Sequence, residues 1–204
     1  MPAEKILHSP KQIIDSSLLR AYFRSMRKII FALAASLDGY IARENGDVDW
    51  LKMEDLIEGA AESREFFNSI DTIFFGRKTY QKGLEMGADG GGGFGSIASY
   101  VFTRTAQKSD DQNLTFVSEN VREFVENLKR QDGKNILLMG GGEIAKTFFE
   151  ENLIDELIIG IQPVILGKGI PLFLPHERQS ELERFDVKTR KSGTVQISYL
   201  VKNT

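Results

Sequence analysis

The sequence has 204 residues, of which 41% are hydrophobic and 27% are charged, as is usual for a globular protein large enough to bury one core. Its net charge of −3 gives no general attraction to nucleic acid or to an acidic membrane, and no apolar run reaches the roughly 20 residues that cross a bilayer. The absence of cysteine excludes disulfides and thiol chemistry, and two histidines, His8 and His176, are too few for a histidine metal centre, so we expect a cytoplasmic enzyme or binding protein without a metal site.

The first 25 residues differ from the rest of the chain. Apolar residues between Ile13 and Phe23 recur at helical spacing and predict a short amphipathic helix, after which a strand begins near Met26. We therefore expect residues 1–25 to be an extension that lies on the domain or on a partner subunit, and residues 26–204 to form one domain.

Predicted strands and helices alternate in the first half of the domain. Residues 28–36 are a nearly continuous apolar run, which is typical of a strand covered on both faces, and a polar loop over 38–49 follows. Apolar residues near helical spacing then predict a helix over 53–69. The next predicted elements are a strand at 72–75, a helical turn opening at 76–79, a glycine-rich loop over 86–98, and strands at 100–103 and 114–117.

The second half continues the alternation. Ser118 is the expected N-cap of a helix that runs to about Lys129. The later predicted elements are a buried strand at 135–139, a helix over 143–152, a long strand over 156–166 interrupted by Pro163, and a hairpin of 184–191 and 194–201 around Ser192-Gly193. This order predicts an α/β fold of three layers, with helices on both faces of a central, mixed, mostly parallel sheet that ends in an antiparallel hairpin.

The triple glycine Gly140-Gly141-Gly142 is the most informative motif. A strand, a corner without side chains and a helix start let the backbone approach a ligand, and the free N–H groups of the helix favour a phosphate. The spacing fits G-x-G-x-x-A, which suggests a dinucleotide. An ordinary Rossmann unit is disfavoured, because the motif comes late in the chain and the next acidic residues, Asp155 and Glu156, precede the following strand instead of closing it.

Three turns follow predicted strands, at 76–79, 103–105 and 140–142. Ligands collect at the carboxyl ends of the strands in an open α/β sheet, so parallel strands would place all three turns along one edge. That edge would carry two helix N-termini and three cationic side chains, each worth roughly 1.5–3 kcal/mol when it binds a phosphate. The three side chains are Arg77, Lys78 and Arg104. This chemistry predicts a phosphorylated nucleotide, and favours a 2′-phosphorylated cofactor.

Several motifs occur in unbroken order over residues 26–203. They are Ala34–Ala42, Gly46–Trp50, Gly76–Tyr80, Tyr100–Thr105, Gly140–Glu143, Leu153–Leu157 and Pro163–Phe173. Together they resemble the dihydrofolate reductase superfamily, and most closely the branch that contains the reductase domain of the riboflavin-biosynthesis enzyme and its small stand-alone relatives.

The resemblance implies a dihydrofolate reductase-like fold and NADPH-dependent hydride transfer in a homodimer. The resemblance also implies which residues bind the cofactor, and these include the three cations named above. Ala34 and Trp50 would border the nicotinamide, and Gly76, Arg77, Lys78 and Thr79 would hold the adenosine side. Thr103 and Arg104 would approach the 2′-phosphate, and Gly140, Gly141, Gly142, Glu143 and Ile144 would surround the pyrophosphate.

Two positions bear on the substrate. Folate-reducing members carry a buried carboxylate at a position that falls near Ala60 here, and riboflavin-pathway members carry a glutamate where this chain has Met139. The implied substrate is a small pyrimidine- or pterin-like heterocycle, such as a ribosylaminopyrimidine. The alternatives are a non-catalytic NADP(H)-binding protein and a true dihydrofolate reductase.

Two aspartates are the candidate catalytic residues. Asp38 ends the first strand beside Gly39, where it either stabilises the turn by bonding its own backbone or contacts the substrate. Asp49 precedes Trp50. As a proton donor Asp49 would need a raised pKa, which burial beside an indole would supply.

Overall fold

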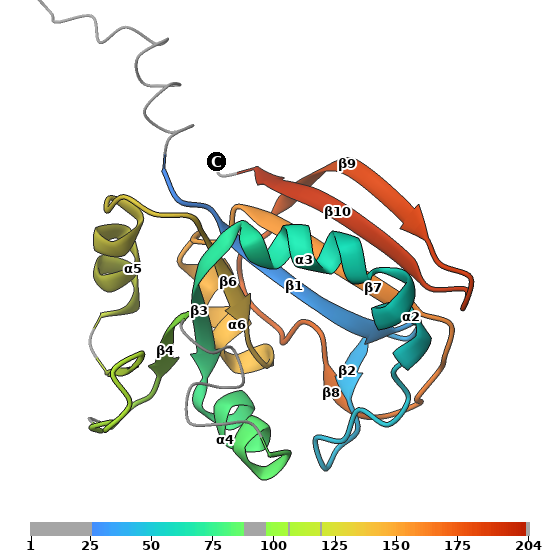
Figure 1. Ribbon diagram of the computed structural model, residues 1–204, viewed down its shortest axis with the longest axis horizontal. Helices are drawn as coiled ribbons and strands as arrows, with labels where there is room; N and C mark the ends of the chain where they lie inside the picture. The colour runs from blue at the N-terminus through green and yellow to red at the C-terminus, as the bar shows by residue number, and fades with distance from the viewer. Residues whose placement is uncertain (1–25, 88–96, 106, 119, 203–204) are drawn as a thin grey trace, which may run out of the picture.

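The computed structural model describes residues 26–87, 97–105, 107–118 and 120–202 (Figure 1). The predicted extension over 1–25 and most of the predicted glycine-rich loop lie outside this part. The strands of the main sheet are β1 (Ile29–Ser36), β3 (Ile70–Gly76), β4 (Ala98–Phe102), β5 (Leu114–Val117), β6 (Asn135–Met139), β7 (Glu156–Gln162), β9 (Glu181–Thr189) and β10 (Val195–Lys202). The described helices are α2 (Met53–Glu58), α3 (Ala60–Asn68), α4 (Arg77–Glu85), α5 (Val121–Lys129) and α6 (Gly142–Glu150).

The main sheet has eight strands in the order β5-β4-β3-β6-β1-β7-β10-β9. The strands from β5 to β7 in this order are parallel, and β10 pairs antiparallel with both β7 and β9. The predicted mixed sheet with a C-terminal hairpin is therefore confirmed. A second, two-stranded sheet pairs β2 (Tyr40–Ala42) with β8 (Ile170–Pro171), inside segments that we expected to be loop or did not assign.

Helices cover both faces of the sheet, because each buried strand presents apolar side chains to both sides. One core cluster packs α5 and α6 against side chains such as Ile29 and Phe31, and the other packs Phe66 of α3 and Tyr80 of α4 against the alternate side chains, such as Ile30. Figure 1 shows α3 crossing β1 and β7 on the near face of the sheet. The three-layer prediction is confirmed.

Aromatic packing fixes β3 relative to its neighbours. The Phe74 side chain is fully buried, and its ring centroid lies 5.2 Å from that of Phe102, 5.8 Å from that of Tyr100 and 5.8 Å from that of Phe148. These edge-to-face contacts join β3, β4 and α6 in one rigid unit. The ends of these three elements are consequently held in fixed positions at one edge of the sheet.

The predicted helix over 53–69 is wrong in one respect, because it breaks at Gly59 into α2 and α3. Gly59 leaves helical geometry at φ −89° and ψ 10°, although its N–H still bonds the carbonyl oxygen of Asp55. A Cβ at Gly59 would lie 3.1 Å from Nη2 of Arg190, so a glycine here lets the β9–β10 hairpin approach the helix pair closely.

Two predicted boundaries also differ. The strand predicted over 156–166 ends at Gln162, since Pro163 has no N–H to extend the ladder. The N-cap of α5 is Asn120 instead of Ser118: its side chain accepts a hydrogen bond from the N–H of Glu123 at 3.2 Å. No helix in the described part of the chain is long and apolar enough to span a membrane.

Candidate active site

The carboxyl ends of the parallel strands line one edge of the sheet. β4 ends at Phe102, β3 at Gly76 and β6 at Met139, and these strands are neighbours in the order β4-β3-β6. Each is followed by one of the three turns that the sequence singled out. The structure thus brings those turns to adjacent places on one edge, as predicted.

The first turns of α4 and α6 are in contact at this edge. A Cβ on Gly76 or on Gly140 would lie 3.1 or 2.1 Å from Cγ2 of Ile144, so both glycines make room for that side chain. Gly141 is different, because a Cβ there would meet only Oγ1 of Thr79, at 3.4 Å. Gly76 and Gly140 therefore serve packing, whereas the Gly141 position stays open.

Two further residues of the predicted pyrophosphate corner are buried. A Cβ on Gly142 would lie 2.8 Å from Cγ of Leu174, and the Ile144 side chain belongs to the core. These residues offer a ligand only their backbone groups.

Neither helix has a side-chain cap at its N-terminus. α4 begins after Gly76 and α6 after Gly141, and a glycine N-cap has no side chain that could bond the first N–H groups, in contrast to Asn120 of α5. Such N–H groups, together with the positive end of the helix dipole, suit an anion.

Cations gather around Glu143 at the start of α6. Nζ of Lys78 lies 2.6 Å from Oε1 of Glu143, and the two side chains are 75% and 62% exposed. The hydrogen bond from Lys78 is the main cause that lowers the pKa of Glu143, and the charges of Arg104 and Arg77 lower it further. An exposed ion pair contributes at most about 1 kcal/mol, so an incoming phosphate can replace this carboxylate.

The β4 turn presents Arg104 on the exposed side. Oγ1 of Thr103 accepts a hydrogen bond from the N–H of Thr105 at 3.4 Å, so this hydroxyl shapes the turn that carries Arg104. Lys78 therefore pairs with Glu143, and the charges of Arg77 and Arg104, which the sequence assigned to the same phosphorylated ligand, act on the same carboxylate.

The other half of the predicted site lies on β1 and β7. Ala34 pairs in register with Gly160, and the alternation from Ile30 places Ala34 on the face that α3 covers. A Cβ on Gly160 would meet nothing closer than 3.9 Å, so two small residues leave space here. We call Ala34 and Gly160 the floor of the site. Trp50 is 8% exposed, so it is more deeply buried than the wall of an open site would be.

Asp49 does not meet the condition for a proton donor, which was burial with a raised pKa. Its side chain is 62% exposed and binds Arg43 through both oxygens, with Oδ1 2.6 Å from Nε and Oδ2 3.1 Å from Nη2. The hydrogen bond from Arg43 is the main cause that lowers the pKa of Asp49. The carboxylate turns to solvent although the neighbouring Trp50 turns inward.

Asp38 joins two loops of the site edge. Its Oδ1 accepts hydrogen bonds from Oγ of Ser36 at 2.7 Å and from the N–H of Leu166 at 3.1 Å, and its Oδ2 accepts from the N–H of Gly167 at 2.7 Å. The Ser36 bond is the main cause that lowers the pKa of Asp38, and the two backbone bonds add to it. Asp38 therefore stabilises loops, as one of the two predicted roles required. The backbone N–H groups that it binds belong mainly to the loop after β7 and not to its own turn.

The sequence did not predict a polar group that links α2 to the β9–β10 hairpin. Oδ2 of Asp55 accepts hydrogen bonds from Oγ1 of Thr194 at 2.6 Å and from Nε2 of Gln162 at 3.4 Å. Thr194 and Gln162 are 4% and 5% exposed. The one available signal was an acidic residue shortly after the Asp49-Trp50 motif, and its partners are more than 100 residues away in the chain.

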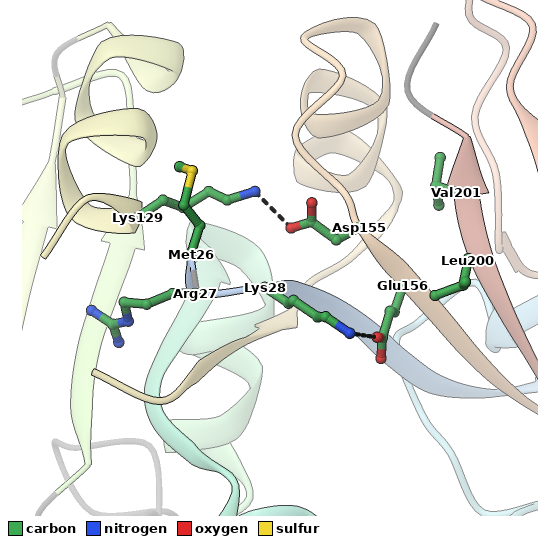
Figure 2. Close-up of a pocket in the computed structure, with 8 residues that line it drawn as sticks. All are labelled: Met26, Arg27, Lys28, Lys129, Asp155, Glu156, Leu200 and Val201. Atoms are coloured by element: carbon green, nitrogen blue, oxygen red, sulfur yellow. Dashed lines mark hydrogen bonds and ion pairs between the residues drawn. The ribbon is translucent and has the colours of Figure 1, made fainter. Parts of the chain in front are cut away.

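A cavity of about 320 Å³ lies at the opposite edge, at the amino ends of β1 and β7 (Figure 2). Its charged groups are paired: Nζ of Lys129 lies 2.7 Å from Oδ2 of Asp155, and Nζ of Lys28 lies 2.6 Å from Oε1 of Glu156. Figure 2 shows the two pairs among the residues that line the cavity, each joined by a dashed line. Because ligands collect at the carboxyl ends of the strands in such a sheet and this cavity lies at the amino ends, it is not the candidate site.

The sheet order and the helices on both faces define a protein with the dihydrofolate reductase-like fold. The chain belongs to the RibD C-terminal domain family, which matches residues 27–198. It is similar to two Bacillus subtilis proteins, the uncharacterized protein YwjB and the uncharacterized protein YyaP. YwjB is 38% identical over 180 residues, which cover 86% of this chain and 95% of YwjB, and YyaP is 37% identical over 188 residues, which cover 85% and 94%.

Solved structures agree with this family. The crystal structure of a putative riboflavin biosynthesis protein from Shewanella sp. PV-4 matches with a TM-score of 0.72 and 26% identity, over 86% of this chain and 99% of that chain. A diaminohydroxyphosphoribosylaminopyrimidine deaminase/5-amino-6-(5-phosphoribosylamino)uracil reductase from Thermotoga maritima matches with a TM-score of 0.65 and 16% identity, over 91% of this chain and 60% of that chain. The resemblance stated from the sequence motifs is confirmed.

The two glycines beside the α6 start are expected to respond differently to alanine. Gly140→Ala lowers the free energy of unfolding by about 1–3 kcal/mol, because the new Cβ overlaps Ile144. Gly141→Ala is the matched control and changes it by less than about 1 kcal/mol, since its φ of −78° suits any residue. Urea unfolding of both variants measures the difference, and equal losses would contradict the distinction.

Proposed function

We propose that this protein is an NADPH-dependent oxidoreductase that reduces a small pyrimidine-like heterocycle of the riboflavin-pathway type. The observation that carries the proposal is the meeting of two uncapped helix N-termini with Arg77, Lys78 and Arg104 at one sheet edge. Membership of the RibD C-terminal domain family supports a reductase of this kind.

The residues present fit the cofactor. The open backbone at Gly141 and the first N–H groups of α4 and α6 would hold the pyrophosphate, and Arg104 would bind the 2′-phosphate. The floor formed by Ala34 and Gly160 leaves room for a flat ring beside the end of β1. When bound, NADPH supplies the hydride, and the protein contributes binding and orientation.

None of the aspartates at this edge is proposed as the proton donor. The pKa values of Asp38, Asp49 and Asp55 are all lowered, so each carboxyl is ionised at neutral pH. A general acid would need the opposite shift. We propose that the proton of the reduction comes from water.

We also propose that the protein is a homodimer. Leu182, Phe185 and Val187 on the edge strand β9 are 42%, 51% and 42% exposed, and a second copy would cover them. The cytoplasmic location stays a prediction of the sequence.

Substrate-dependent oxidation of NADPH tests the function. Purified protein is mixed with NADPH and with ribosylaminopyrimidines, pterins or dihydrofolate, and the loss of nicotinamide absorbance is followed. We expect turnover with a ribosylaminopyrimidine and none with dihydrofolate. NADPH binding without any turnover would contradict the reductase and leave the non-catalytic NADP(H)-binding alternative.

Gly141→Val is expected to weaken NADPH binding more than about tenfold, because a branched side chain would fill the space that the pyrophosphate needs. Thermal unfolding checks that the variant keeps its fold. A folded variant with the NADPH affinity of the wild type would remove Gly141 from the cofactor site.

Arg104→Ala is expected to narrow the preference for NADPH over NADH by about 10- to 100-fold, since it removes one charge-assisted bond to the 2′-phosphate. Lys108→Ala is the control, because it removes the same charge from an exposed position in the same connection. The dissociation constants of both cofactors are measured for each variant. An unchanged ratio in Arg104→Ala would rule out the phosphate role.

A further inference from the structure

Glu143 places a carboxylate at the edge where the phosphates of a coenzyme are expected. It belongs to the first turn of α6, which begins directly after Gly141. Its Oε1 accepts a hydrogen bond from Nζ of Lys78, in the first turn of α4, at 2.6 Å. The side chain therefore joins the two helix starts that suit an anion, and a phosphate that binds there meets a negative charge already in place.

This carboxylate is ionised at neutral pH. The hydrogen bond from Lys78 lowers the pKa of Glu143 most, and partial burial opposes it. The charges of Lys78, Arg104 and Arg77 lower that pKa further. An ionised carboxylate only accepts hydrogen bonds, so the side chain of Glu143 cannot bond a phosphate oxygen and repels it instead.

Stabilisation of a helix start explains only part of this arrangement. An acidic residue in the first turn complements the helix dipole, and Glu123 has the same place in α5. The dipole does not require a lysine from a different helix. The partner of Glu143 is nevertheless Lys78 of α4, 65 residues away in the chain, and Lys78 is one of the three cations assigned to the phosphorylated ligand.

The contact can be exchanged for a ligand. The side chains of Lys78 and Glu143 are 75% and 62% exposed, and an ion pair of this kind contributes little to stability. A phosphate can therefore take the place of the carboxylate on Lys78. The displaced carboxylate stays attached to α6, so its repulsion continues to act on the bound ligand.

The repulsion acts most strongly on a 2′-phosphorylated coenzyme. The charge of Arg104 acts on Glu143, so Glu143 acts equally on a phosphate that Arg104 binds. A 2′-phosphate adds a charge of about −2 that the unphosphorylated coenzyme lacks. The neighbouring Arg77 donates a hydrogen bond to the neutral amide of Gln81 at 3.4 Å, and this contact leaves its positive charge available to a phosphate.

We propose that Glu143 is a specificity-determining residue, which competes with the coenzyme phosphates for Lys78 and restrains the preference for the 2′-phosphorylated coenzyme. This rests on the proposed function, since Glu143 acts at the same cofactor site. Arg104 provides the preference for NADPH, and Glu143 limits how far that preference goes and how tightly the coenzyme is held.

Glu150 is the matched control for Glu143. It lies in the last turn of the same helix, where its Oε1 is 3.7 Å from Nζ of Lys146 and both side chains are 39% exposed. Glu150→Gln therefore removes the same charge from an exposed lysine pair on α6, away from the helix start. A difference between the two variants reports the position of the charge and not the net charge of the protein.

The test compares NADP⁺ with NAD⁺, which differ only in the 2′-phosphate. Isothermal titration calorimetry gives both dissociation constants for wild type, Glu143→Gln and Glu150→Gln. We expect Glu143→Gln to bind NADP⁺ about 5- to 20-fold more tightly and NAD⁺ at most about threefold more tightly. Glu150→Gln leaves both affinities as in wild type, and thermal unfolding confirms that each variant is folded.

A second background isolates the competition for Lys78. In Lys78→Met the carboxylate of Glu143 has lost its partner, so its removal no longer frees a cation for the phosphate. Adding Glu143→Gln to Lys78→Met is therefore expected to increase the NADP⁺ affinity by less than half of the factor found in wild type. An equal factor in both backgrounds would contradict competition for Lys78.

Three other results would each overturn the proposal: no gain of NADP⁺ affinity in Glu143→Gln, equal gains for NADP⁺ and NAD⁺, or the same gain in Glu150→Gln. None of these readouts requires turnover. If wild type binds NADP⁺ but Glu143→Gln changes nothing, this inference fails and the reductase proposal stands. If the ratio shifts as expected but no substrate causes oxidation of NADPH, only the proposed reductase function fails.

Discussion

The contact of Ile144 with Gly76 and Gly140 sets the geometry of the candidate site. One branched side chain from the first turn of α6 occupies the space that a Cβ would fill at the end of β3 and at the end of β6. The contact brings the starts of α4 and α6 together, so the first turns of both helices, neither of which has a side-chain N-cap, lie at the same edge of the sheet. Without this close approach Lys78 of α4 would not reach Glu143 of α6.

Aromatic side chains in the core pack the elements that carry the starts of α4 and α6 against one another. Phe74 of β3 contacts Phe148 of α6 and Phe102 of β4, so the two strands that precede the cationic turns and the helix that follows the glycine corner are packed together. The ion pair between Lys78 and Glu143 contributes less to the stability of this region than the aromatic packing does, because the pair is exposed to solvent and screened by salt. A rigid frame with an exchangeable carboxylate suits a site that binds and releases an anionic cofactor.

The sequence predicted the features that follow from local patterns. Continuous apolar runs identified the parallel strands, and the positions of Gly76, Arg104 and Gly140 after those strands were enough to place them on one edge. It did not predict features that depend on distant contacts. Gly59 lies against Arg190 at the helix break, Asp49 turns outward to Arg43, and Asp55 meets Thr194, and no periodicity in the sequence encodes these pairs.

The two halves of the site offer a ligand different chemical groups. Around β3 and β6 the chain offers backbone groups and tightly packed glycines, and a side chain on Gly76, Gly140 or Gly142 would disturb the packing. Around β1 and β7 it offers side chains such as Asp55, Thr194 and Gln162, which come from three separate segments. Mutation can therefore exchange the second set one residue at a time while the first set is preserved. A scaffold divided in this way lets a lineage acquire new substrates during evolution and keep its coenzyme.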